Sequence, residues 1–265
     1  MRSRIDMTLI IGARCKDGVV LVGDKKVTGG VKLYTNKIRR LGSVEWIIFS
    51  AAGFEALYKE FLEEVEKEFL FTLSVRDAQR HANPTIPQHP FTLNDFKHIC
   101  TETAKKLKSI YSELGNDIPF KYRLQVLFVS YEIVGTKRVA SLFYMDMGDC
   151  FPYPIDEGGI IEIGHPDLGK VFLQNYEKGR NFTMKEIARI SSFIIKYAEK
   201  EKLDDNDTVG VGSEQPQIWF YPDSATDPKP YEVKGDELTE LLKGIDSEID
   251  KIISQIGSSS TFLRS

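Results

Sequence analysis

The chain opens with short runs of apolar and β-branched residues separated by turn-forming residues, a pattern typical of β-strands. Two such runs cover residues 8–14 and 19–23. The Lys-Asp-Gly sequence at 16–18 lies between them and is a strong signal for a tight turn that joins antiparallel strands. Residues 24–28 continue the second run until Gly29-Gly30 breaks it. The pattern therefore predicts a β-hairpin at the start of the chain.

A second hairpin and then a helix are predicted next. Residues 37–38 and the mainly apolar segment 46–52 suit two strands, with the tip of the hairpin near Gly42. After Gly53 the apolar residues recur at every fourth position, with Glu and Lys between them, which predicts an amphipathic helix. The residues of this apolar stripe are Leu57, Phe61, Val65 and Phe69.

A loop and a second helix follow in the pattern. The stretch of about 71–90 carries three prolines and no clear period, so we expect a long surface loop there. The second helix is predicted from Thr92, its capping residue, to about Leu114. Its inner face would carry Phe96, Ile99, Thr103, Leu107 and Ile110.

The second half of the chain repeats the same alternation of strands and helices. Strands are predicted at 124–134, 139–146 and 159–163, helices at 167–176 and 183–202, and a last strand pair at 208–212 and 217–221. A further helix at 236–256 and a disordered polar end are expected in the tail. Helices grouped between mostly antiparallel strands favour an α+β layered sandwich. A dinucleotide-binding fold is disfavoured, because no Gly-x-Gly-x-x-Gly follows the first strand.

Composition narrows the class of protein. The 265 residues are 42% hydrophobic and 28% charged, which is ordinary for a globular protein with a large core. The net charge of -4 gives no reason to expect a nucleic acid or an anionic membrane as partner, and no run of about 18 apolar residues predicts a membrane span. The cysteines, Cys15, Cys100 and Cys150, lack metal-ligand spacing and suit reduced, buried thiols. We expect a cytoplasmic protein without metal or cofactor.

The most specific signal lies between residues 8 and 53. Thr8 is followed by a glycine four positions on, by Lys-Asp-Gly-Val-Val at 16–20, by Asp24, and by a threonine at 28. This register resembles the opening of a proteasome β subunit, whose first residue is a threonine nucleophile. Lys37 resembles the catalytic lysine of that family, after a loop about three residues shorter than usual. Gly53 matches the glycine whose N–H forms the oxyanion hole.

Each of these residues also fits an ordinary structural role. Thr8 suits the first position of an edge strand, Asp24 and Lys37 suit surface charges, and Gly53 suits a tight strand-to-helix turn. Their common register is what favours the resemblance. Because only seven residues precede Thr8 and an α-type subunit carries a helix there, we expect a β-type subunit.

The resemblance implies a fold and a division of the chain. The fold is the four-layer αββα sandwich of the N-terminal nucleophile (Ntn) hydrolases, in which two antiparallel sheets lie between helix layers. It would cover residues 8–221, with the loop at about 71–90 as an insertion. Residues 1–7 would be a short N-terminal extension or a mis-assigned start. Residues 222–265 would be a C-terminal extension with one helix and a disordered tail.

The resemblance also implies roles for the matched residues. A threonine hydroxyl needs a base to take its proton. A free α-amino group on the same residue can be that base, since its pKa is about 8. Thr8 would be this nucleophile, with Lys37 and Asp24 tuning it electrostatically. The amide of Gly53 would stabilise the tetrahedral oxyanion.

Two later motifs depart from the family pattern. Gly-His-Pro at 164–166 falls where the family has Gly-Ser-Gly, so that His165 replaces a serine of the active-site network. His165 suits either a different proton relay or a capping and packing role. Asp205 and Thr208 resemble the Asp-x-x-Ser pair that supports the nucleophile, although Asp204 or Asp207 is an equally good candidate for the acid.

The implied function is a threonine-type endopeptidase or a proteasome-like subunit in intracellular protein degradation. It would act on a peptide or unfolded protein and assemble as a homo- or hetero-oligomer with proteasome-like subunits. Two alternatives remain open: an inactive structural paralogue, and a transpeptidase or ligase that passes the acyl group to an amine. Any of the enzymatic readings needs a free amine on Thr8. We therefore expect translation to begin at Met7 and an aminopeptidase to remove it.

Overall fold

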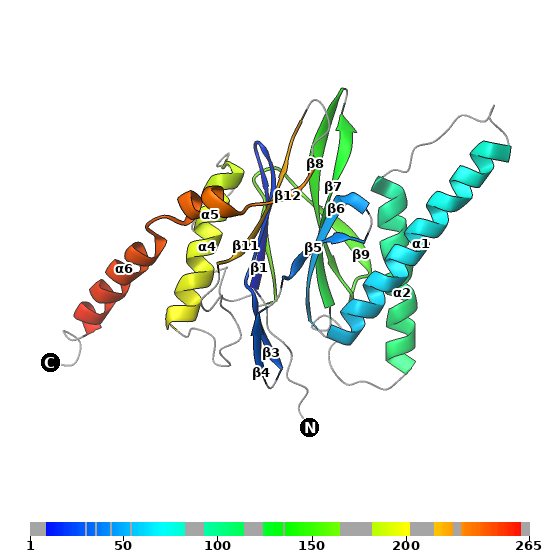
Figure 1. The fold of residues 1–265 in the computed structure, drawn as a ribbon. Helices are drawn as coiled ribbons and strands as arrows, with labels where there is room; N and C mark the ends of the chain where they lie inside the picture. Colours follow the sequence, from blue (N-terminus) through cyan, green and yellow to red (C-terminus); the bar gives the residue numbers. More distant parts are fainter. Residues whose placement is uncertain are drawn as a thin grey trace.

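The computed structural model describes residues 9–29, 31–34, 36–42, 44–53, 55–82, 93–113, 124–134, 136–164, 182–201, 215–224 and 229–260. Within these segments, two five-stranded antiparallel sheets face each other between two layers of helices (Figure 1). Apolar side chains fill all three spaces between the layers. The predicted four-layer αββα sandwich is confirmed.

The first sheet has the strand order β10-β1-β2-β11-β12. Its strands are β1 (Leu9–Cys15), β2 (Gly18–Gly23), β10 (Ile160–Gly164), β11 (Gln217–Pro222) and β12 (Tyr231–Glu232). The expected turn between β1 and β2 is present, with Cys15 opposite Gly18. Gly18 has a φ of +148°, and a Cβ there would lie 2.3 Å from the carbonyl oxygen of Tyr221, so only glycine fits.

The second sheet has the order β5-β6-β7-β8-β9. Its strands are β5 (Ile38–Leu41), β6 (Val44–Gly53), β7 (Leu124–Val134), β8 (Lys137–Asp146) and β9 (Phe151–Ile155). The sequence pattern did not predict β9, because Pro152 and Pro154 remove two backbone donors. The strand forms because it lies at the edge of the sheet, where only one side needs a partner.

The segment after β2 differs from the prediction. Residues 24–28 do not continue the second strand. The chain instead leaves the sheet at Asp24 and forms a separate hairpin of β3 (Lys26–Gly29) and β4 (Val31–Tyr34). This hairpin extends below the two sheets in Figure 1. Local strand propensity was therefore correct, whereas the assignment of the strand to the first sheet was wrong.

The helices form the two outer layers. α1 (Glu55–Ala82) and α2 (Leu93–Glu113) cover the second sheet, while α4 (Met184–Glu201), α5 (Gly235–Leu242) and α6 (Ile245–Ser260) lie on the side of the first sheet (Figure 1). Among the helices of the described segments, none combines the length and apolar character needed to cross a bilayer. The three cysteines are free and buried, as expected.

The predicted loop at 71–90 is wrong in its first part, because α1 continues to Ala82. Residues 71–82 contain no proline, and half of them are Leu, Arg, Ala or Gln, which have good helix propensity, so the helix extends although this part is largely exposed. The prolines that suggested a loop begin only at Pro84, and residues 83–90 lie outside the described residues.

The C-terminal extension also differs from the prediction, because it holds two helices instead of one. The expected helix at 236–256 ends at Leu242 and restarts at Ile245, since Gly244 has a φ of +81° that no helix accommodates. α6 also reaches Ser260, past the point where a disordered end was expected. Residues 261–265, the helix expected at 167–176 and the strand expected at 208–212 lie outside the described residues.

Candidate active site

A buried ion pair joins the two sheets at one end. Asp24 follows β2 of the first sheet, and Lys37 precedes β5 of the second. The Lys37 Nζ atom donates to Asp24 Oδ1 over 2.7 Å. Asp24 is fully buried and Lys37 is 9% exposed. A buried ammonium needs a counter-charge, because removing either partner leaves an uncompensated charge inside the protein.

The same carboxylate holds the start of β1. The Leu9 amide donates to Asp24 Oδ1 over 2.9 Å, and the Asp24 amide donates back to the Leu9 carbonyl over 3.0 Å. Asp24 Oδ1 therefore accepts both a backbone N–H and the Lys37 ammonium, which are charge-assisted bonds. Leu9 directly follows Thr8 in the sequence. Thr8 itself lies outside the described residues.

The segment that carries Lys37 is hydrogen bonded to both sheets. The Ser50 hydroxyl donates to the Lys37 carbonyl over 2.8 Å. The next residue, Ile38, is opposite Ser50 in the β5–β6 pair and is also hydrogen bonded to the side chain of Gln217. Ser50 and Gln217 are buried, and neither was singled out in the sequence.

Gly53 is the last residue of β6 and has a φ of +127°, a backbone conformation that residues other than glycine rarely adopt. It lies three positions beyond Ser50 on the strand beside β5. At roughly 3.3 Å per residue, Gly53 is about 10 Å along β6 from the level of Ile38. The sequence-predicted strand-to-helix junction is therefore where expected, at the same end of the sheets as the ion pair.

The end of β10 reaches the same region. Gly164 is opposite Leu9 in the β10–β1 pair, and its amide donates to Gln125 Oε1 over 3.1 Å. Gln125 lies in β7, opposite Ala52, the residue before Gly53. This side chain therefore connects the end of β10 to the opposite sheet. His165 follows Gly164 in the sequence and, like Asp205 and Thr208, lies outside the described residues.

Gln125 continues into a polar chain on the second sheet. Its Nε2 donates to the Tyr144 hydroxyl over 3.1 Å, and that hydroxyl donates to Asp146 Oδ2 over 3.3 Å. Burial raises the pKa of the Tyr144 phenol to about 12, and the Asp146 charge adds to this effect. Burial also raises the pKa of Asp146. The hydrogen bond that the Gly148 amide donates to Asp146 Oδ1 acts in the opposite direction and lowers it. Tyr144 is therefore a neutral donor at physiological pH.

Of the predicted site residues, the described segments hold Asp24, Lys37 and Gly53. Asp24 and Lys37 are in contact, Gly53 lies nearby on β6, and the chain neighbours of Thr8 and His165 are paired with each other. The residues that sequence reasoning missed are Ser50, Gln125 and Gln217. Each occupies an ordinary polar position in a strand, and no local motif marks it. No cluster of three or more His, Cys, Asp or Glu placed to hold a metal ion occurs within the described segments.

A known protein family matches the first part of the chain. Residues 7–71 match the family model described as proteasome subunit, over the stretch that holds Thr8, Asp24, Lys37 and Gly53. The predicted resemblance to proteasome subunits is confirmed. No sequence of a curated protein matches this chain at a significant level.

Solved structures share the fold over nearly the whole chain. Anbu from Hyphomicrobium sp. strain MC1 has a TM-score of 0.61 at 14% identity, covering 94% of this chain and 97% of that one. A Gly-1 mutant of Anbu from the same strain gives 0.60 at 14% identity, with 94% and 99% covered. Anbu from Yersinia bercovieri, described as an ancestral β-subunit, gives 0.59 at 14% identity, with 93% and 97% covered. This chain therefore has the fold of these proteins.

Proposed function

We propose that this chain is a threonine-type peptidase subunit in which Thr8, as the N-terminal residue, is the nucleophile. The proposal rests on the buried Asp24–Lys37 pair. The Asp24 oxygen that accepts the Lys37 ammonium also accepts a hydrogen bond from the amide of Leu9. This arrangement holds an ammonium group and the backbone next to Thr8 at a set separation. A surface ion pair would not do so, because exposed pairs contribute little and move freely.

The proposed reaction follows from these groups. The Thr8 hydroxyl attacks a peptide carbonyl, and its proton passes to the α-amino group of the same residue. The Lys37 ammonium lowers the cost of negative charge on the hydroxyl oxygen, and Asp24 keeps that ammonium charged and in place. The Gly53 amide donates to the oxyanion. The amine leaves with the proton, and water then hydrolyses the Thr8 ester to release the acid.

The remaining predicted residues have proposed roles of the same kind. Asp205 with Thr208 would support the nucleophile, as the family resemblance implies. His165, which replaces the serine of the family pattern, would relay a proton in its place. We place the catalytic domain at residues 8–221. The extension from 222 packs on it, because Leu242, Ile245 and Ile249 are buried in the core cluster that includes residues of α4 and β1. The proposed substrate is a peptide or unfolded protein in the cytoplasm, and the proposed partners are copies of this chain or similar subunits.

The free amine of Thr8 is the first point to test. We propose that Met7 is the translation start and that an aminopeptidase removes it before the small Thr8. Intact-mass measurement and N-terminal sequencing of the protein purified from its native cells would identify the first residue. A mature chain that begins at Thr8 supports the proposal, whereas a mature chain that begins at Met1 contradicts it.

The nucleophile is tested with an electrophilic probe for N-terminal threonine. The mass of the native protein should rise by the mass of one probe molecule, and the mass of a Thr8→Ala variant produced in the same way should not change. Peptide hydrolysis measured beside transfer to an added amine separates a peptidase from a transpeptidase or ligase. A native chain that begins at Thr8 and forms no Thr8-dependent adduct would identify a structural paralogue instead.

A further inference from the structure

We propose that Gln217 is a positioning residue that sets the place of the Lys37 ammonium by holding the backbone of Ile38 from the opposite sheet. Its effect on the reaction rests on the proposed role of Thr8, but its effect on Lys37 does not.

Gln217 behaves toward Ile38 as a neighbouring strand would. The Ile38 amide donates to Gln217 Oε1 over 2.9 Å, and Gln217 Nε2 donates to the Ile38 carbonyl over 2.8 Å. Ile38 begins β5, which is the edge strand of the second sheet. Ile38 is also 1% exposed, so water does not reach its backbone groups. One amide side chain therefore satisfies both backbone groups of a buried edge residue.

The position of Gln217 also links it to the other half of the ion pair. In the first sheet Gln217 lies opposite Gly23 of β2. Gly23 is the chain neighbour of Asp24, and Ile38 is the chain neighbour of Lys37. A single side chain that is 2% exposed thus contacts the segment of Lys37 and lies beside the segment of Asp24. The two bonds of this glutamine therefore hold the Ile38 backbone at a defined distance from β11.

Apolar packing between the sheets does not set that separation as sharply. Dispersion and burial are not directional, so facing apolar layers tolerate small displacements. Two hydrogen bonds to one residue are directional and weaken steeply as angles and distances change. Lys37, which donates to Asp24 over 2.7 Å, directly precedes the residue that these two bonds hold. Losing them would let Ile38, and Lys37 with it, move relative to Asp24.

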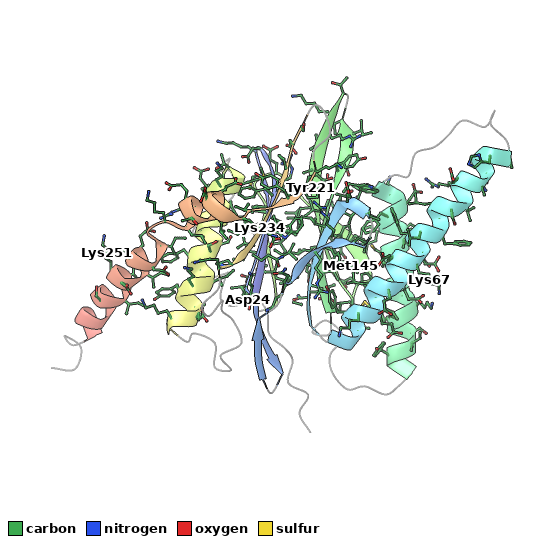
Figure 2. All side chains as sticks on the ribbon, in the orientation of Figure 1. Asp24, Lys67, Met145, Tyr221, Lys234 and Lys251 are labelled. Atoms are coloured by element: carbon green, nitrogen blue, oxygen red, sulfur yellow. The ribbon has the colours of Figure 1, made fainter. Side chains whose placement is uncertain are left out.

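The chain offers a matched control on the same strand. The Tyr221 hydroxyl donates to the Trp46 carbonyl over 3.0 Å, which is also a bond from β11 to the backbone of the opposite sheet. Tyr221 is fully buried and lies four positions from Gln217, so both side chains point to the same face. Asp24 and Tyr221 lie toward opposite ends of the sheets in Figure 2. A Tyr221→Phe variant therefore removes a similar bond far from Lys37.

The test compares Gln217→Met with Tyr221→Phe in the full chain. Solvent exchange of the Lys37 ammonium protons is measured by NMR on protein labelled at lysine, with the signal assigned through Lys37→Arg. We expect exchange at least about tenfold faster in Gln217→Met and unchanged in Tyr221→Phe. The rate of probe addition to Thr8 should fall about ten- to a hundredfold in the first variant only.

The outcomes distinguish the positioning role of Gln217 from the proposed reaction at Thr8. Equal Lys37 exchange in the two variants would overturn the positioning role, whether or not the wild type is labelled. Faster exchange with no labelling of the wild type would support the positioning role and contradict the proposed reaction. If Gln217→Met does not fold, Gln217→Asn replaces it, because its side chain is one methylene shorter and does not reach both backbone groups of Ile38.

Discussion

Lys37 and Asp24 form a buried ion pair of 2.7 Å although they belong to the ends of two different sheets. The Asp24 oxygen that accepts the ammonium also accepts the Leu9 amide. Three separate segments thus meet at one carboxylate oxygen. Asp24 and Lys37, which match the family pattern, therefore hold this end of the molecule together in addition to their proposed roles in the reaction.

Replacing Asp24 by asparagine should therefore destabilise the protein strongly. The Lys37 ammonium would stay buried without a carboxylate, and breaking such a pair by removing one partner costs about 3–5 kcal/mol. Urea unfolding of the variant and the wild type measures the difference. The control is Glu45→Gln, which removes an exposed pair with Lys229 and should leave the midpoint unchanged. Equal midpoints for Asp24→Asn and the wild type would contradict the buried pair.

Gly53→Ala should lower both stability and reactivity. A φ of +127° is strained for alanine, and residues in such regions cost about 1–3 kcal/mol. The control is Gly235→Ala, since Gly235 has a φ of +59° and open space around its Cα. Both variants should lose stability in thermal unfolding, but only Gly53→Ala should slow probe addition to Thr8. Equal labelling rates would argue against an oxyanion role for the Gly53 amide.

The stability contributed by Asp146 should fall as the pH rises. Burial raises its pKa in the folded protein above its ordinary value of 3.8, so the folded state favours the protonated acid. Below the ordinary pKa the carboxyl is neutral in both states. As the pH rises toward the folded pKa, ionisation favours the unfolded chain, and stability is lost over that range.

The measurement for Asp146 is the free energy of unfolding against pH for the wild type and Asp146→Asn. The wild type should lose stability relative to the variant as the pH rises above about 4, and the difference should become constant above the folded pKa. A wild type that gains relative stability over this range would show that the Tyr144 and Gly148 hydrogen bonds dominate burial.

The C-terminal helices should contribute to the core of the domain. Ile245 is fully buried in the cluster with residues of α4, so Ile245→Ala should cost about 2–5 kcal/mol. Ile252, on the same helix, is 36% exposed, and Ile252→Ala should cost much less. Urea unfolding of both variants decides the point. Equal, small losses would indicate that α6 is an appendage independent of the domain.

Several features of the fold were predictable because they depend on neighbours in the sequence. The Lys-Asp-Gly turn at 16–18 and the four-residue apolar period of α1 are local patterns with a direct physical cause. The break in the tail was less predictable, since Gly244 inside an apolar period reads as a tolerated helix residue until its φ is known. The length of α1 was underestimated, because residues 71–82 show no apolar period and are followed by prolines from Pro84 on.

By itself the sequence determined where most of the strands lie along the chain, the helix stripes and the register from Thr8 to Asp24, Lys37 and Gly53, because each depends on short spacings. Only the tertiary structure decided that Asp24 and Lys37 are buried together and that Gln217 holds Ile38 from a position 179 residues away. The cause is physical. A polar side chain within a strand carries no local signal of its partner, and the packing of two sheets determines which buried backbone groups it must satisfy.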